Sequence, residues 1–248
     1  MFNRWFLSVV ILMTISALVM VIYLDSRENA SEQLDLSAPR TATSGRSLNT
    51  DSLLQPVPVP DHEVERIEYA ASVLDTLTNT RARLPYYGEI IRIYSGARNY
   101  DAAAKWAGLR ARQTGEREDM LHAAQLHLAA MQQKNEDYLI KEEAKKAKEM
   151  YISALELKPD DPDVLTDLAV VHMSLLQPEE SYSRLAQALR TDPDHLRANF
   201  NMGVLLHQMG SISESIPFFN RSLALTDDPD WEVVVQDYLD RHHNELFH

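Results

Sequence analysis

Residues 158–228 read KPDDPDVLTDLAVVHMSLLQPEESYSRLAQALRTDPDHLRANFNMGVLLHQMGSISESIPFFNRSLALTDD, and the pattern of this stretch returns after 34 residues. The positions that recur at this interval are Pro159, Pro193 and Asp227; Ala154, Ala188 and Ser222; Leu155, Leu189 and Leu223; Tyr151, Leu185 and Phe219; Ala147, Ser181 and Ser215; and Ala169 and Gly203. A fixed period of this size is the signature of a solenoid array.

Each unit of the array predicts two helices. Steps of three and four residues, which place side chains on one helix face, separate Leu165, Leu168, Ala169 and His172 in one stripe and Ser181, Leu185 and Ala188 in another. Small residues in both stripes let the two backbones approach closely. Pro193 ends its unit, because a helix rarely continues through the residue before a proline. The sequence therefore predicts stacked helix hairpins.

At these residues the stretch resembles the tetratricopeptide repeat, in which Leu-Gly and Tyr on a first helix precede Ala, Phe and Pro on a second. The matching sets are Leu165-Leu168-Ala169 with Ser181-Leu185-Pro193, Met202-Gly203 with Ser215-Phe219, and Ala147-Tyr151-Ala154-Pro159. The departures from the pattern are Asn199 for a large residue, His172 and Leu206 for Tyr, and Asp227 for Pro. The resemblance covers residues 144–229 and implies an all-α solenoid that binds protein.

Helical patterns continue on both sides of the repeats. Residues 61–143 predict degenerate hairpins, with helices at 61–79, 86–97, 100–114, 116–133 and from 139 onward. Residues 230–248 carry an apolar stripe of Trp231, Val234, Val235, Tyr238 and Leu239. A terminal helix of this kind covers the exposed face of the last hairpin, so this segment is predicted to be a capping helix.

The N-terminal part of the chain predicts a membrane anchor. After a head at residues 1–4, residues 5–24 contain no charge, and twenty helical residues span about 30 Å of hydrocarbon. The alternative is a cleaved signal peptide, but no small-x-small site follows the apolar run. Arg4 lies before the span and Arg27 and Arg40 lie after it. The positive charges on the two sides are therefore nearly equal, and the positive-inside rule alone does not fix the orientation. A short head is expected to stay in the cytoplasm. In a Gram-negative bacterium, this inner-membrane protein would hold its repeats in the periplasm.

Residues 25–60 predict a disordered tether. They are rich in Ser, Thr, Asp and Pro and end in Pro56-Val57-Pro58-Val59-Pro60. Such a composition buries too little apolar surface to fold alone, and its proline-rich end favours an extended form. The alternative is a docking peptide for a proline-recognising domain.

Composition and charge exclude several kinds of site and partner. The 248 residues include no cysteine, which excludes disulfides, thiol catalysis and zinc-thiolate sites. Residues 159–248 carry 16 acidic side chains against 5 Arg, a net charge of −11, whereas residues 81–158 carry 14 basic against 11 acidic, a net charge of +3. An acidic array repels nucleic acid and favours a basic protein partner. The alternative is that the acids only keep the array soluble.

Signals for catalysis and cofactors are weak. The sequence has no nucleophile elbow, phosphate loop or dinucleotide fingerprint. His242, His243 and His248 lack a further ligand type at fixed spacing, and His172 falls at a packing position. The sequence therefore predicts a protein that is not an enzyme and that holds no cofactor and no metal.

The remaining candidate site is the concave groove that the first helices of successive hairpins line. Its predicted residues are Asp163, Thr166, Asp167, Val170, Arg197, Phe200, Asn201, Val204 and His207. Phe200 and Val204 are expected to form an apolar anchor. Arg197 and Asn201 would suit a carboxylate, but Asp163 and Asp167 would repel it.

These patterns predict a membrane-tethered adaptor or scaffold that binds a segment of a partner protein. Bacterial proteins of similar architecture serve envelope assembly, secretion or biogenesis complexes. The expectation of such a role rests on the likeness of architecture alone. The alternative function is a structural homo-oligomerisation module without a separate client.

Overall fold

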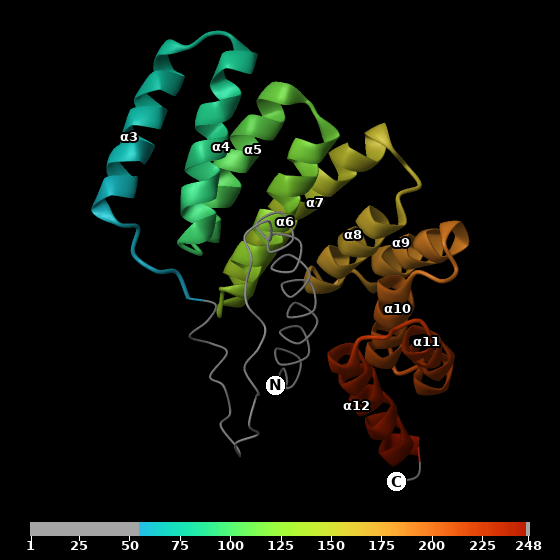
Figure 1. Cartoon of the computed structure of the whole chain (residues 1–248). Helices are drawn as coiled ribbons and strands as arrows, with labels where there is room; N and C mark the ends of the chain where they lie inside the picture. The colour runs from blue at the N-terminus through green and yellow to red at the C-terminus, as the bar shows by residue number, and fades with distance from the viewer. Residues whose placement is uncertain (1–54, 247–248) are drawn as a thin grey trace.

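The chain forms a left-to-right run of antiparallel α-helices (Figure 1). The computed structural model describes residues 55–246, and side chains up to residue 240. Within these residues every regular element is an α-helix, with bounds α3 Asp61–Thr76, α4 Thr80–Gly96, α5 Tyr100–Thr114, α6 Arg117–Gln132, α7 Asp137–Leu157, α8 Pro162–Ser174, α9 Pro178–Thr191, α10 Leu196–Gln208, α11 Ile212–Ala224 and α12 Pro229–Leu246.

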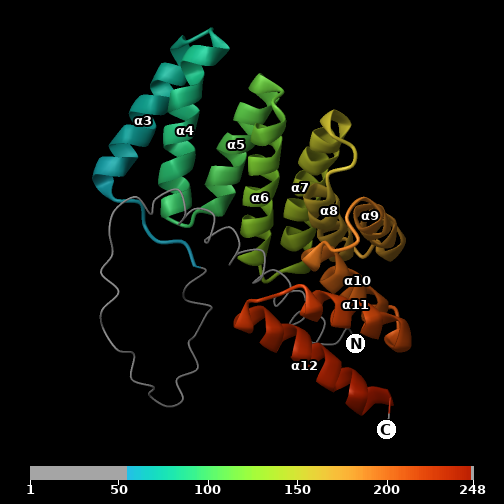
Figure 2. The same ribbon diagram turned by 45° about the vertical axis from the view of Figure 1, so that its right-hand side comes forward.

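The helices pair into four hairpins, α4–α5, α6–α7, α8–α9 and α10–α11, with α3 and α12 at the two ends. Each helix contacts the next one in the chain, and the first helices α8 and α10 also contact each other. Figure 2 shows the same succession after a turn of 45° about the vertical axis. The prediction of an all-α hairpin solenoid is therefore confirmed. The predicted anchor at residues 5–24 lies outside the described residues, and none of the helices α3–α12 is long and apolar enough to cross a membrane.

Polar caps fix several helix starts. The side chains of Asn79 and Asn99 accept hydrogen bonds from the backbone N–H groups of Ala82 and Ala102, which satisfies donors that a helix start leaves free. The helix expected at residues 86–97 begins six residues earlier, at Thr80. Pro85 is tolerated in its second turn because it removes only one early backbone hydrogen bond.

A charged cluster ties three helices together at the α7–α8 turn. Asp161 caps α8 by accepting from the Val164 N–H at 3.4 Å. Its other oxygen accepts hydrogen bonds from Arg117 of α6 at 2.6 Å and from Lys158 at 2.8 Å. Burial raises the pKa of Asp161, but the bonds from Lys158 and Val164 and the Arg117 charge outweigh it and lower that pKa. The two cations therefore keep this buried carboxylate charged.

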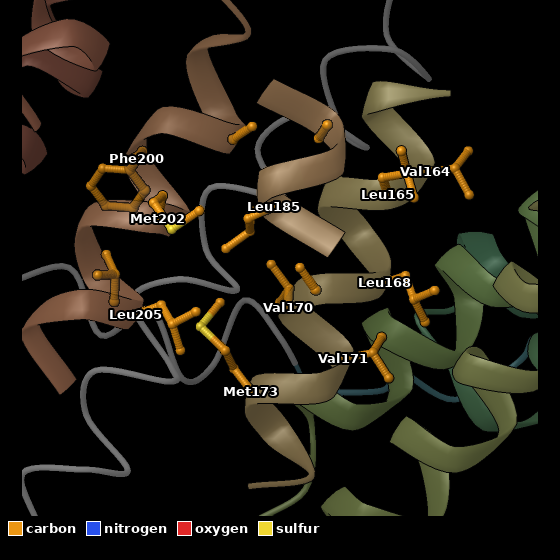
Figure 3. Close-up of a cluster of buried hydrophobic side chains, with 14 of the residues drawn as sticks. Val164, Leu165, Leu168, Val170, Val171, Met173, Leu185, Phe200, Met202 and Leu205 are labelled. Carbon is orange, nitrogen blue, oxygen red and sulfur yellow. The ribbon is translucent and has the colours of Figure 1, made fainter. Parts of the chain in front are cut away.

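The apolar core runs through the whole stack. One cluster joins α6 to α12 and another joins α3 to α6, and Met150 packs against both. In Figure 3, Leu185 of α9 points between Met202 of α10 and Val170 of α8, and Met173 reaches toward Leu205. The spacing of apolar residues thus gives each helix two apolar faces. One packs against the other helix of its hairpin, and the other packs against the next hairpin.

Small residues set the distance between the helices of a hairpin. The Ser181 hydroxyl donates to the Ala169 carbonyl at 3.0 Å, across α8 and α9. One repeat later, Gly203 of α10 lies directly against the ring of Phe219 of α11. These contacts explain why the 34-residue pattern requires small side chains at the crossing point.

Candidate partner-binding face

The nine predicted groove residues all lie on the first helices α8 and α10, but they differ widely in exposure. We call this set the first-helix face. Five of its members are buried, namely Thr166, Val170, Phe200, Asn201 and Val204. Asp163 is the most open of the charged members, with 74% of its side chain exposed. The face is therefore more closed than the helical pattern alone predicts.

Phe200 does not form the open anchor that the sequence predicts. It is 2% exposed, and its ring lies 5.0 Å from that of Trp231 and 5.5 Å from that of Tyr238, both on α12. Phe219 of α11 completes the cluster at 5.8 Å from Phe200. The physical reason is that α12 packs where the first helix of a further repeat would lie, so it covers Phe200. Val204 is likewise fully buried, in the core.

Arg197 and Asp167 form an ion pair between α10 and α8. The Tyr151 hydroxyl of α7 donates to the other Asp167 oxygen at 3.3 Å. The Asp167 charge raises the pKa of Arg197, and burial followed by the same charge raises the pKa of Tyr151 well above its usual value. Because Asp167 neutralises Arg197 internally, this guanidinium is not free to receive a ligand carboxylate.

Asp163 pairs with His195, which begins the next repeat. The Nδ1 atom of His195 accepts a hydrogen bond from the Ala198 N–H at 3.0 Å and so caps α10. Its Nε2 atom therefore carries the proton and donates to Asp163 at 3.0 Å. The hydrogen bond from His195 lowers the pKa of Asp163. The exposed carboxylate of Asp163 is held in place and remains negative.

Two asparagines on α10 have opposite roles. Asn199 is buried, and its amide donates to the carbonyls of Pro193 and His195, each at 3.0 Å. Asn201 is 6% exposed, yet no hydrogen bond of its side-chain amide is found among the described residues. An Asn side chain can both donate and accept hydrogen bonds, so Asn201 is the member of the face best suited to bind a partner's backbone.

Sequence reasoning misses several residues that shape the face. The apolar pattern does not predict that Tyr151 and His195 contact it, and it predicts Trp231 and Tyr238 as part of a capping stripe without showing that they cover Phe200. The 34-residue period relates Asp163 to Arg197 and Arg197 to Trp231. That spacing signals equivalent positions in successive first helices. It does not reveal which side chains meet, because those contacts join residues of different helices.

Histidines elsewhere in the array are structural. His172 is buried and its Nδ1 lies 2.8 Å from the Gln177 side-chain oxygen, and burial lowers its pKa. His127 of α6 contacts Glu143 of α7 at 2.7 Å. No cluster of three or more His, Asp or Glu side chains suited to a metal occurs within the described residues. The side chains of His242, His243 and His248 lie outside the described part.

Comparison with known proteins identifies the repeat. Residues 196–229, which span α10 and α11, match the family model of the tetratricopeptide repeat (TPR). The chain is 37% identical over 68 residues to the protein O-mannosyl-transferase TMTC3 of Homo sapiens, and 32% identical over 87 residues to TMTC1 of Mus musculus. These matches cover 27% and 34% of this chain but 7% and 9% of the relatives. The chain therefore spans less than a tenth of the length of either relative.

Solved structures show the same fold. A thermophilic TPR protein of Thermus thermophilus superposes with a TM-score of 0.53 at 16% identity, covering 71% of this chain and 98% of that one. A crystal structure of MamA superposes with a TM-score of 0.50 at 16% identity, covering 64% of this chain and 85% of that one. The architecture described here is thus a TPR-like helical solenoid.

Proposed function

We propose that this protein is a membrane-tethered scaffold that binds an extended segment of a partner protein on its first-helix face. In this proposal residues 5–24 span the bacterial inner membrane once and the repeats work in the periplasm. The assembly it serves belongs to envelope assembly, secretion or biogenesis, and the protein itself carries no catalytic site.

The observation that carries this proposal is the Asn201 amide, for which no hydrogen bond is found among the described residues. An extended peptide presents unpaired N–H and C=O groups along its length, and one Asn side chain both donates and accepts. Pairing with such a backbone would give the Asn201 amide hydrogen bonds that the described residues do not supply. Asp163, open and negative on the neighbouring helix α8, would pair with Lys or Arg of the partner.

The arrangement argues against an anionic partner. Arg197 is already paired with Asp167, and the net charge of the chain is −13. A ligand carboxylate would have to displace Asp167, which would leave this partly buried acid without its cation. A partner segment of neutral or basic character therefore fits this face.

The test is photo-crosslinking in intact membranes with a photo-reactive amino acid at Asp163. The matched control position is Tyr182, which is 46% exposed on the second helix α9. We expect a partner to be captured from position 163 alone, and capture to fall about ten-fold in Asn201→Ala, which corresponds to the loss of one or two hydrogen bonds. Asn201→Ala should leave the free energy of unfolding within about 0.5 kcal/mol of wild type.

Asn199→Ala serves as the comparison for stability. Asn199 has two backbone partners, so its replacement should destabilise the fold where that of Asn201 does not. Equal capture from positions 163 and 182 would contradict a working first-helix face. Crosslinks only between copies of the chain would instead favour the homo-oligomerisation module.

A further inference from the structure

The two turn edges of the solenoid differ in chemistry. Successive helices are antiparallel, so the turns within hairpins follow one edge and the turns between hairpins follow the other. In Figure 1 the α3–α4 turn, which leads into the first hairpin, lies on the upper side. The α5–α6 and α7–α8 turns, which join successive hairpins, lie on the same side. The last three turns of this second edge are acidic on balance, with Asp160, Asp192, Asp194, Asp227 and Asp228 against one Lys158.

The edge made by the turns within hairpins is mixed: its first two turns carry Arg98, Lys134 and Glu136, whereas its last two turns are uncharged. The exposed large apolar side chains that lie there are Val57, Tyr138, Leu176 and Met209, at 47%, 65%, 50% and 50% exposure. We call this set the apolar turn edge. The turn residues 175–177 and 209–211 contain no charged side chain. Leu157, at 58% exposure, lies instead at the acidic edge, at the end of α7.

Leu176 is the most informative member of the apolar turn edge. Its φ is +58°, a left-handed conformation that a branched side chain rarely adopts. Gly210 occupies the equivalent position 34 residues later, with φ +82°, and glycine is the residue that this conformation favours. Arg98 in the α4–α5 turn has the same conformation, with φ +55°, so the backbone conformation belongs to the turn. What distinguishes position 176 is its exposed apolar side chain.

The chain enters the solenoid at this same edge. The Val57 N–H donates to the Ala97 carbonyl in the α4–α5 turn at 2.9 Å, and Val59 packs against the N-terminal core cluster. Residues 55–60 therefore enter the solenoid along the apolar turn edge. In Figure 1 this segment joins α3 at its lower end, opposite the α3–α4 turn.

We propose that the apolar turn edge lies on the membrane surface, with Leu176 and Met209 inserted into the lipid interface and Tyr138 at the level of the headgroups. This inference rests on the proposed tether, because the anchor would bring this edge, and not the acidic one, to the bilayer. Aromatic side chains favour the membrane interface, and exposed apolar ones gain by insertion.

The charges of the array support the same orientation. The acidic turn edge would be repelled by anionic headgroups and so faces away from the membrane. Glu179 and Glu180 follow Leu176 on the first turn of α9 and are exposed. They limit insertion to the tips of the turns, so the contact is shallow and leaves the first-helix face open to a partner.

The absence of cysteine makes the experiment direct. Single variants Leu176→Cys, Met209→Cys and Leu157→Cys of the full chain would carry a nitrobenzoxadiazole label in phosphatidylcholine vesicles with or without brominated lipid. Leu157 is the matched control, because it is equally apolar and exposed but lies at the opposite edge. Brominated lipid should lower the emission about two-fold at positions 176 and 209 and leave position 157 unchanged.

Vesicle flotation separates the possible failures. If the chain floats with the vesicles but quenching is equal at positions 176 and 157, or absent at both, the tether stands and the proposed orientation is wrong. If the chain does not float, the tether and the orientation are both wrong. A blue shift at position 176 that grows with protein density without quenching would identify a contact between copies and overturn the lipid contact.

Discussion

At the scale of single residues, Gly203 shows why a repeat position is restricted to a small side chain. A Cβ atom at this position would lie 2.9 Å from Cδ1 and Cε1 of Phe219, and Phe219 is fully buried. Replacement by alanine gains helix propensity of up to about 1 kcal/mol but forces the ring to move, at a cost of about 1–3 kcal/mol. We expect Gly203→Ala to lower the free energy of unfolding in urea titrations.

Gly108→Ala is the control for this substitution. A Cβ atom added at Gly108 of α5 would meet only the flexible end of the Arg112 side chain, at 3.5 Å. Its stability should equal or exceed that of wild type, since the propensity gain has no steric cost to offset it. Equal stability of the Gly203 and Gly108 variants would show that the approach of α10 to α11 tolerates a Cβ atom.

Glu143 predicts a stability difference at acid pH. Burial pushes its pKa upward, but the hydrogen bonds from His127 and Lys146 outweigh burial and hold the pKa at about 2, below the ordinary 4.5. A lowered pKa contributes stability above pH 4.5, and this contribution is lost as the pH falls from 4.5 toward 2.

We expect Glu143→Gln to cost about 3 kcal/mol at pH 7 and progressively less below pH 4.5. Urea unfolding of both proteins across this pH range measures the difference. Glu142→Gln is the control, because Glu142 is an exposed neighbour on the same helix. A wild-type advantage that stays constant down to pH 2 would contradict the assigned role of Glu143.

At the scale of elements, α12 is the capping helix that covers the exposed face of the last hairpin. Trp231 packs edge-on against Phe200, and its indole N–H donates to the Ser222 hydroxyl at 3.1 Å. Tyr238 stacks on Phe219 with ring centroids 5.1 Å apart. The short loop after α11 keeps these rings close, so α12 adds an aromatic layer that α10 and α11 lack by themselves.

Trp231→Ala should release α12 without unfolding the stack. Loss of a large aromatic contact costs about 3 kcal/mol, and repeat arrays respond chiefly in neighbouring units. We expect hydrogen exchange to accelerate in α10, α11 and α12, and to stay unchanged in α4 to α6. Val233→Ala, at a position 69% exposed on α12, should change nothing. Faster exchange throughout the chain would mean that the array unfolds as one unit.

At the scale of the whole molecule, connectivity separates three surfaces. The first-helix face carries the polar groups suited to a partner, the apolar turn edge carries the exposed turn residues, and the acidic turn edge carries most turn aspartates. Because each helix contacts mainly its neighbours in sequence, these surfaces run continuously along the stack. A tether held at the apolar turn edge would therefore orient all three surfaces at once.

The amino-acid sequence by itself determined the repeat, the helix hairpins and the all-α solenoid, because apolar periodicity and proline positions are local properties. The prediction extends to helix bounds, as at residues 100–114, and it failed at Thr80 because a proline inside the first turns hides a helix start. Tertiary structure decided which first-helix residues a partner can reach. Phe200 lies under α12 and Arg197 is paired with Asp167, since burial and ion pairing depend on side chains 30 or more residues away.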